Sequence, residues 1–296
     1  MASIVLAHPF FLAKAPEEQE LSSPYFPLGL LYLAAYLRER GHEVSIFDGT
    51  FHDDESAFAD LLAGGVPDIV GVSALATTRD TALALAAMAA DAGAVVVIGG
   101  PDPTVAPAPY LADQAVDVVV HHEGEQTLAR LLDLHDGGAL TVASLAEEPG
   151  VAYRLDGRVV VNQPRPPIEN LDELPLPARD LIDMDRYLKS WEDNHGYSSI
   201  TVATARGCPF GCEWCRDSVH GDGFRQRSPE SVAAEVRALT ERYDVERLRL
   251  IDDVDEIDRT WFEEWADASE DHPVPFEPLH TSKRDDLPLL DVRDSL

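Results

Sequence analysis

The stretch Thr204-Ala-Arg-Gly-Cys208-Pro-Phe-Gly-Cys212-Glu-Trp-Cys215 holds all three cysteines of the 296-residue chain. Residues 199–204, which lead into it, are β-branched and apolar, and this pattern predicts a buried strand that ends in a loop. An iron–sulfur cluster bound by cysteine normally takes four thiolates. Three thiolates in one small volume would therefore leave one iron of a [4Fe–4S] cluster free to bind another ligand.

Two other interpretations of the cysteines remain open from the residues themselves. Zinc accepts three cysteines and one histidine, and His220 lies five residues after Cys215, so a zinc knuckle is one alternative. The other alternative is that the three thiols are incidental.

The spacing C-x3-C-x2-C, with an aromatic residue directly before the last cysteine, resembles the signature of the radical S-adenosylmethionine (SAM) superfamily. The matching residues are Cys208, Cys212, Trp214 and Cys215. The resemblance implies that the open iron binds the amino and carboxylate groups of SAM. An electron from the cluster would then cleave the sulfonium, and the 5′-deoxyadenosyl radical would abstract a hydrogen from the substrate. Phe210 and Trp214 are expected beside the cluster and SAM, where they exclude water.

Composition excludes several other classes of protein. The net charge is −31, with three lysines against twenty arginines, so the surface is a poor match for nucleic acid. Many carboxylates with few lysines indicate adaptation to high salt, which screens their repulsion. The longest apolar run, residues 28–37, is too short to span a membrane. With no basic, apolar leader and three clustered cysteines, we expect a protein of the reducing cytoplasm.

Residues 1–138 alternate between apolar strands and helices of ten to fifteen residues. This pattern predicts an α/β domain with a doubly wound, Rossmann-like parallel sheet. The expected strands are residues 3–8, 43–47, 68–73, 94–98 and 116–120, and the clearest helices are 27–37, 79–92 and 125–135.

Four segments of this domain resemble the cobalamin-binding domain that precedes many radical SAM barrels. They are Pro27–Ala34, Asp68–Ser73, Gly99–Thr104 and Glu123-Gly-Glu125. The sequence lacks the Asp-x-His-x-x-Gly segment that supplies a histidine to cobalt in some cobalamin proteins, and position 102 is Asp where the family often has His. If cobalamin binds, the resemblance implies binding without a protein imidazole.

Ligands of such sheets lie beyond the carboxyl ends of the strands. The residues expected to contact cobalamin there are His8, Ser73, Ala74, Gly99, Gly100 and Gly124. Two alternatives remain: the glycines could serve tight strand-to-helix turns, and His8, His121 and His122 could be ordinary polar loop residues.

Residues 139–198 are expected to join two domains, through a hairpin around Asp156-Gly157 and a segment rich in proline and acidic residues. The pattern of residues 199–296 predicts a β-α-β-α-β order. This order resembles the first half of the six-unit partial barrel of radical SAM enzymes. By that resemblance Asp252, Asp253 and Arg284 would contact SAM, although an ordinary acidic turn also explains the two aspartates.

Together these features predict a cobalamin-dependent radical SAM enzyme, similar to anaerobic magnesium-protoporphyrin ester cyclases and class B methyltransferases. It would transfer a methyl group or form a ring at an unactivated carbon of a small molecule, with a ferredoxin- or flavodoxin-type electron donor. The alternative is a non-catalytic remnant that binds cobalamin and a cluster, or half of a split enzyme whose barrel is completed by a second chain.

Overall fold

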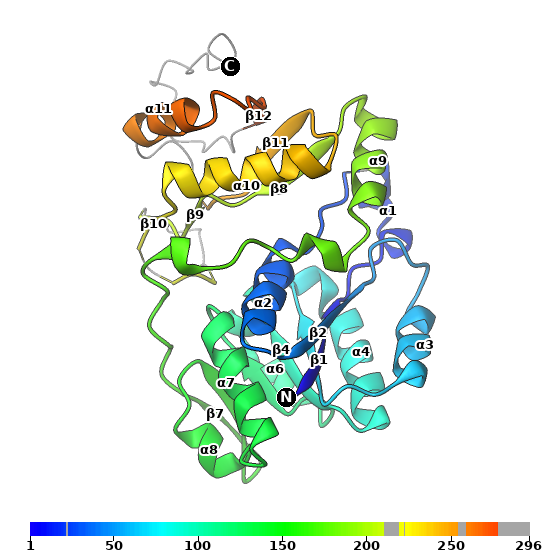
Figure 1. Ribbon diagram of the computed structural model, residues 1–296. Helices are drawn as coiled ribbons and strands as arrows, with labels where there is room; N and C mark the ends of the chain where they lie inside the picture. Colours follow the sequence, from blue (N-terminus) through cyan, green and yellow to red (C-terminus); the bar gives the residue numbers. More distant parts are fainter. Residues whose placement is uncertain (22, 210–218, 222, 254–258, 278–296) are drawn as a thin grey trace.

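The first part of the chain, residues 1–161, forms a seven-stranded sheet with the order β2-β1-β3-β4-β5-β6-β7. The computed structural model describes residues 1–21, 23–209, 219–221, 223–253 and 259–277 (Figure 1). Strands β1 to β5 are parallel, and the predicted α/β fold is confirmed. The strands are β1 (Ser3–His8), β2 (Glu43–Asp48), β3 (Ile69–Ser73), β4 (Val95–Gly99), β5 (Val118–Val120), β6 (Val151–Leu155) and β7 (Arg158–Val161).

Helices cover both faces of this sheet. One face buries Phe58, Leu85 and Tyr110 from three helices, and the other buries Leu37 and Leu131. The helices of this part are α1 (Pro16–Leu21), α2 (Leu28–Glu39), α3 (Ser56–Gly64), α4 (Arg79–Ala92), α5 (Pro101–Val105), α6 (Pro107–Leu111), α7 (Glu125–Asp136) and α8 (Val142–Ala146), with 3-10 turns at Leu12–Lys14 and Ala76–Thr78. The strand order reverses between β1 and β3, so a ligand crevice is expected at their carboxyl ends.

The hairpin predicted around Asp156-Gly157 is present, and both residues have positive φ, at 50° and 75°. It extends the sheet of the first part, because β6 pairs antiparallel with β5 through Val118 and Tyr153. One local detail differs from the sequence analysis: Pro27 is the N-cap of α2, whereas the expected helix begins at this residue. Residues 10–26 contain α1 and a 3-10 turn.

The second part of the chain, residues 184–277, contains a three-stranded parallel sheet with the order β12-β11-β8. Ser228 caps α10 through its side chain and Pro229 opens the helix, as these residue types commonly do at a helix start. The elements of this part are α9 (Met184–His195), β8 (Ser199–Val202), β9 (Ala205–Arg206), β10 (Arg225–Gln226), α10 (Pro229–Arg242), β11 (Arg247–Leu250), α11 (Arg259–Ala268) and β12 (Phe276–Glu277). The order β8-α10-β11-α11-β12 agrees with the expected repeat, and residues 278–296 lie outside the described part of the chain.

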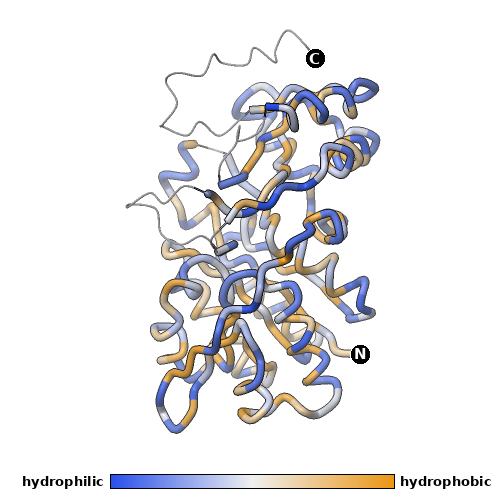
Figure 2. Tube along the Cα trace, turned by 90° about the vertical axis from the view of Figure 1, so that its left-hand side faces the viewer, coloured by the Kyte–Doolittle hydropathy of each residue, from blue (hydrophilic) through white to orange (hydrophobic). Residues whose placement is uncertain are grey.

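Helix α2 lies between the two parts (Figure 1). Leu30, Ala34 and Leu37 pack against the first sheet. Leu31 and Tyr32, on another face of the helix, join the core of the second part with α9, α10 and α11. The apolar stretches of both parts are visible in Figure 2. A helix that is apolar on all sides is buried on all sides, so the run at residues 28–37 marks the contact between the parts. Among the described residues, no helix has both the length and the apolar character to cross a bilayer.

We predict that Leu31→Ala lowers the free energy of unfolding by about 2–5 kcal/mol, the usual cost of a cavity in a core. Leu31 is fully buried and packs in the core shared by α2 and the second part. The measurement is urea unfolding followed by circular dichroism. Leu21→Ala is the control, because 61% of Leu21 is exposed. Equal losses in the two variants would contradict the role assigned to α2.

Candidate functional site

The cysteine-bearing segment begins and ends at a short antiparallel pair of strands. Arg206 of β9 pairs with Arg225 of β10, so this pair joins the two ends of residues 207–224, the segment that the sequence analysis predicts as the cysteine loop. Cys208 lies just inside the loop and is partly buried. The other residues predicted for the cluster and SAM, namely Phe210, Cys212, Trp214, Cys215 and Arg284, lie outside the described residues. The structure therefore defines the two ends of the loop.

A close backbone approach precedes Cys208. Gly207 has a φ of +81°, and a Cβ placed on it would lie 2.1 Å from the carbonyl oxygen of Gly223. Any other residue at position 207 would push apart the two arms of the loop, by which we mean the described residues next to Arg206 at its start and next to Arg225 at its end. The backbone conformation and the contact with Gly223 therefore require glycine at position 207.

Asp252 and Asp253, predicted to contact SAM, contact the backbone that leads to Cys208. Asp252 is 4% exposed and accepts hydrogen bonds from the N–H groups of Thr204 and Ala205, at 2.7 and 2.9 Å, and from the Thr204 hydroxyl. Asp253 accepts a hydrogen bond from the Gly207 N–H at 3.1 Å. The two aspartates at the end of β11 thus hold the strand-to-loop turn after β8.

The residues predicted to contact cobalamin follow the strands of the first sheet. His8, Ser73 and Gly99 end β1, β3 and β4, and Gly124 precedes α7. Gly100 has a φ of +110°, and a Cβ there would lie 2.7 Å from the carbonyl oxygen of Ala74. This glycine is therefore needed for the turn between β4 and α5 whether or not a ligand is bound.

Three polar side chains at this edge of the first sheet, those of His8, Asp102 and His121, have different surroundings. Burial lowers the pKa of His8, and the Asp48 carboxylate partly opposes this effect. Asp102, at the position where an imidazole was considered, forms an ion pair with Arg79 at 2.8 and 2.9 Å and accepts a hydrogen bond from Tyr110. His121 is buried, and within the described residues its Nε2 atom has no hydrogen-bond partner.

Charged side chains join the arms of the cysteine loop to the first part; we call Glu123, Glu125, Arg206 and Arg225 the inter-domain clamp. Arg206 Nη2 lies 2.6 Å from Glu125 Oε1, and Arg206 Nη1 lies 3.3 Å from Glu123 Oε1. Arg225 Nη1 lies 2.8 Å from the same Glu123 oxygen. Burial alone would raise the pKa of Glu123, but His220, the Ile168 N–H and the two guanidinium groups lower it to about 2.

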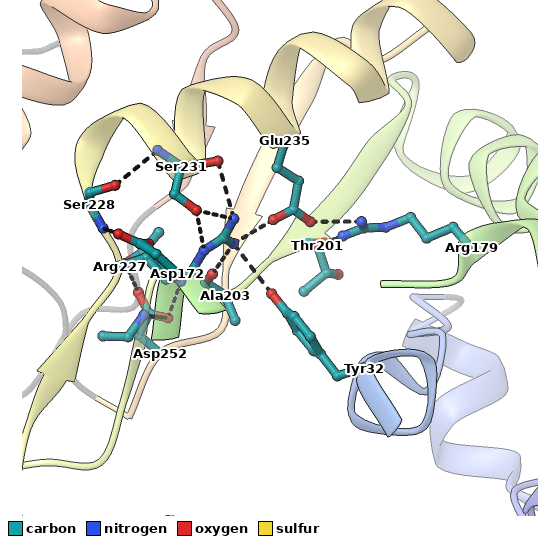
Figure 3. A network of polar contacts seen from close by, with 12 residues as sticks. Tyr32, Asp172, Arg179, Thr201, Ala203, Arg227, Ser228, Ser231, Glu235 and Asp252 are labelled. Carbon is teal, nitrogen blue, oxygen red and sulfur yellow. Dashed lines mark hydrogen bonds and ion pairs between the residues drawn. The ribbon is translucent and has the colours of Figure 1, made fainter. Parts of the chain in front are cut away.

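A second group, the buried Arg–Glu network, lies between α2, α10 and the joining segment (Figure 3). Glu235 of α10 is 1% exposed and forms ion pairs with Arg179, at 2.7 Å, and with Arg227. Arg227 also donates to the carbonyl oxygen of Ala203 and to the hydroxyl of Tyr32. Burial, reinforced by the Glu235 carboxylate, raises the pKa of Tyr32 to about 12. Tyr32 therefore stays neutral and ties α2 to this network.

Sequence reasoning missed both groups. The sequence analysis expects residues 139–198 only to join two domains, yet Arg179 of this segment is buried in the second network. A signal was present, since Arg206, Arg225 and Arg227 flank the cysteine segment and Glu123-Gly-Glu125 belongs to a segment already singled out. The pairing of Arg206 and Arg225 with Glu125 and Glu123 could not be derived, because these partners lie 81 and 102 residues apart in the chain.

Comparison with known proteins identifies relatives of the chain. Residues 19–132 match the B12 binding domain family. An uncharacterized methyltransferase of Pyrococcus horikoshii is 36% identical over 232 residues, 77% of this chain and 48% of that protein. The anaerobic magnesium-protoporphyrin IX monomethyl ester cyclase of Synechocystis sp. is 25% identical over 297 residues, 97% of this chain and 55% of the cyclase. The chain spans about half the length of these curated relatives.

Solved structures share the fold. The cobalamin-dependent SAM radical enzyme OxsB, with aqua-cobalamin and SAM bound, superposes with a TM-score of 0.75 over 93% of this chain and 38% of OxsB, at 18% identity. The methyltransferase TsrM of Kitasatospora setae, with cobalamin and a [4Fe–4S] cluster bound, gives 0.69 over 92% of this chain and 51% of TsrM, at 19% identity.

The chain therefore carries a B12-binding domain, within the α/β fold of cobalamin-dependent radical SAM proteins. More particularly, its sequence is similar to those of an uncharacterized methyltransferase and of magnesium-protoporphyrin IX monomethyl ester cyclases, the two kinds of relative that the sequence analysis predicted.

We predict that Glu235→Gln lowers the free energy of unfolding by about 3–5 kcal/mol, because two buried guanidinium groups lose their common carboxylate. Glu263→Gln removes a partner of Arg259 on the surface of α11, where 63% of the Glu263 side chain is exposed. That control should cost about 0.5 kcal/mol or less. Urea unfolding of both variants checks the prediction, and a loss from Glu235→Gln as small as the control's would contradict it.

The Glu235 carboxylate should also make the free energy of unfolding depend on pH. Burial raises the pKa of Glu235, but Arg179 and Arg227 outweigh burial and hold the pKa below its usual value. A carboxyl with a lower pKa in the folded state stabilises the fold above its unfolded pKa of about 4.3 and loses that contribution as pH falls. The difference in unfolding free energy between wild type and Glu235→Gln should therefore narrow below about pH 4.5. Parallel pH profiles in urea titrations would contradict this.

Proposed function

We propose that the chain is the cofactor-binding portion of a cobalamin-dependent radical SAM enzyme, with Cys208, Cys212 and Cys215 as ligands of a [4Fe–4S] cluster. One observation carries the proposal: the loop that begins at Gly207 follows a parallel strand of the second part and is tied by charge to the strand-end edge of a B12-binding domain. Soft thiolate donors suit an iron–sulfur cluster. The donor set therefore fits the group that the relatives imply.

The edge of the first sheet also fits a corrin. His8, Ser73, Ala74, Gly99, Gly100 and Gly124 are small or polar residues at strand ends and helix starts. Such residues allow a large planar ligand to approach the backbone closely. Position 102 holds an aspartate, and its carboxylate is paired with Arg79 and Tyr110. We therefore propose that cobalamin binds here without an imidazole from position 102.

When bound, the two groups would supply an electron that cleaves SAM reductively and a cobalt centre that relays a methyl group or assists ring formation. The chain's own residues perform a different task. Asp252 and Asp253 hold the turn before Cys208, and Gly207 lets the two arms of the loop meet. By this proposal they place the first cysteine at the end of β8, beside the B12-binding domain, and Asp252 acts on SAM only through the loop it holds.

The substrate of the proposed reaction is a small organic molecule with an unactivated carbon, and the electron donor is a protein of the ferredoxin or flavodoxin type. The alternative is a non-catalytic protein that binds cobalamin and a cluster, and the experiments below distinguish it from an enzyme.

We predict that anaerobic treatment with iron and sulfide yields about four irons per chain, and that Cys212→Ala loses them. Hydroxocobalamin bound by the first part should be retained in the same variant, which makes cobalamin the internal control. Iron assays and visible spectra measure both. One zinc per chain in place of iron would overturn the cluster assignment.

The dithionite-reduced, loaded protein should release 5′-deoxyadenosine from SAM, measured by chromatography. An intact cluster that releases none would favour the binding protein or the split enzyme over catalysis by this chain alone.

A further inference from the structure

Glu123 occupies a junction of three segments of the chain. It lies between β5 and α7 of the B12-binding domain, and its side chain is 7% exposed. Its Oε1 atom faces Arg206 and Arg225, the two residues that close the cysteine loop. Its Oε2 atom accepts a hydrogen bond from the N–H of Ile168, in the joining segment, at 2.7 Å.

The other partners of the junction make it rigid. Arg225 Nη1 also donates to the carbonyl oxygen of Ile168, at 2.7 Å, and its Nη2 donates to the carbonyl oxygen of His220, at 3.0 Å. Glu125 accepts from Arg206 at 2.6 Å. Buried ion pairs tolerate little displacement, because a separated charge would face its full desolvation cost. The two arms of the loop and the joining segment are therefore fixed to a single carboxylate.

This junction is close to the proposed cluster. Only Gly207 separates Arg206 from Cys208, which limits their Cα separation to about 7 Å. The carboxylate belongs to the same edge of the first sheet as the proposed corrin contacts, because Gly124 follows it directly. A shift of the arms relative to Glu123 would change the separation between the two cofactors.

We propose that Glu123 is a positioning residue that fixes both ends of the cysteine loop to the B12-binding domain and so sets the distance from cluster to cobalt. The inference rests on the proposed function. It assigns Glu123 no contact with SAM, substrate or either cofactor. Glu123 acts through Arg206 and Arg225.

The test compares wild type with Glu123→Gln, which keeps the size and an oxygen acceptor for Ile168 but removes the charge. The matched control is Glu148→Gln, because Glu148 is equally buried and pairs with Arg165 away from the loop. Each protein is loaded with iron, sulfide and hydroxocobalamin and then reduced, so that the cluster and cobalt(II) both carry an unpaired spin. Pulsed electron paramagnetic resonance measures their dipolar splitting, which depends on the distance between them.

The expected result is a single splitting in wild type and Glu148→Gln that is broadened or lost in Glu123→Gln, at unchanged iron and cobalt content. The same splitting in Glu123→Gln would overturn the proposal. If Glu123→Gln does not fold, Arg225→Gln replaces it with the same expectations, because it releases the trailing arm from the other side of the same contact.

Hydrogen–deuterium exchange of the protein without cofactors separates this proposal from the proposed function. Glu123→Gln should exchange backbone amides faster at residues 205–209 and 219–227, whereas Glu148→Gln should match wild type there. Failure of wild type to take up iron would overturn the proposed function, and the exchange experiment would still decide the role of Glu123. Unchanged exchange in both arms would show that Glu123 does not fix the loop.

Discussion

Four buried arginines constrain how the two parts of this protein fit together. The side chains of Arg179, Arg206, Arg225 and Arg227 are between 5% and 10% exposed. Their carboxylate partners are Glu123, Glu125 and Glu235. A buried guanidinium without its partner costs several kcal/mol, so arrangements that separate these charges are strongly disfavoured. The burial of apolar side chains around α2 drives the two parts together. The buried ion pairs favour the one arrangement of the parts in which each charge has its partner.

Local signals in the sequence predicted much of the fold. Ser228-Pro229 is a typical helix start and begins α10, Asp156-Gly157 predicted a hairpin, and the helix predicted at residues 79–92 matches α4. These features depend on backbone preferences within a few residues, and such preferences are legible in a single sequence. The ten-residue apolar run also predicted a buried helix, but an apolar residue does not specify its partner. The double burial of α2 therefore emerged only from the structure.

The sequence predicts the donors of the candidate site but does not indicate the contacts that hold the segment carrying them. The cysteine spacing predicts a cluster through its resemblance to a known signature, and that signal lies within eight residues. Asp252 lies 48 residues from Thr204, Glu125 lies 81 residues from Arg206, and Glu123 lies 102 residues from Arg225. No periodicity links residues so far apart. A carboxylate that holds a loop and one that binds a ligand look the same in a sequence, and only the geometry distinguishes them.

The choice of arginine over lysine follows from the same burial. Among the described residues, both lysines lie on the surface, in pairs with Glu55 and Asp193, while the fully buried cations are arginines. A guanidinium offers five donors in a fixed plane and is more weakly hydrated than an ammonium, so it suits a pair that must be desolvated. Salt at about 0.1–0.15 M largely screens the interactions between exposed charges that lie more than about 8–10 Å apart, but it affects buried pairs much less. The high net negative charge would thus be screened at high ionic strength, while the contacts that position the cysteine loop would persist.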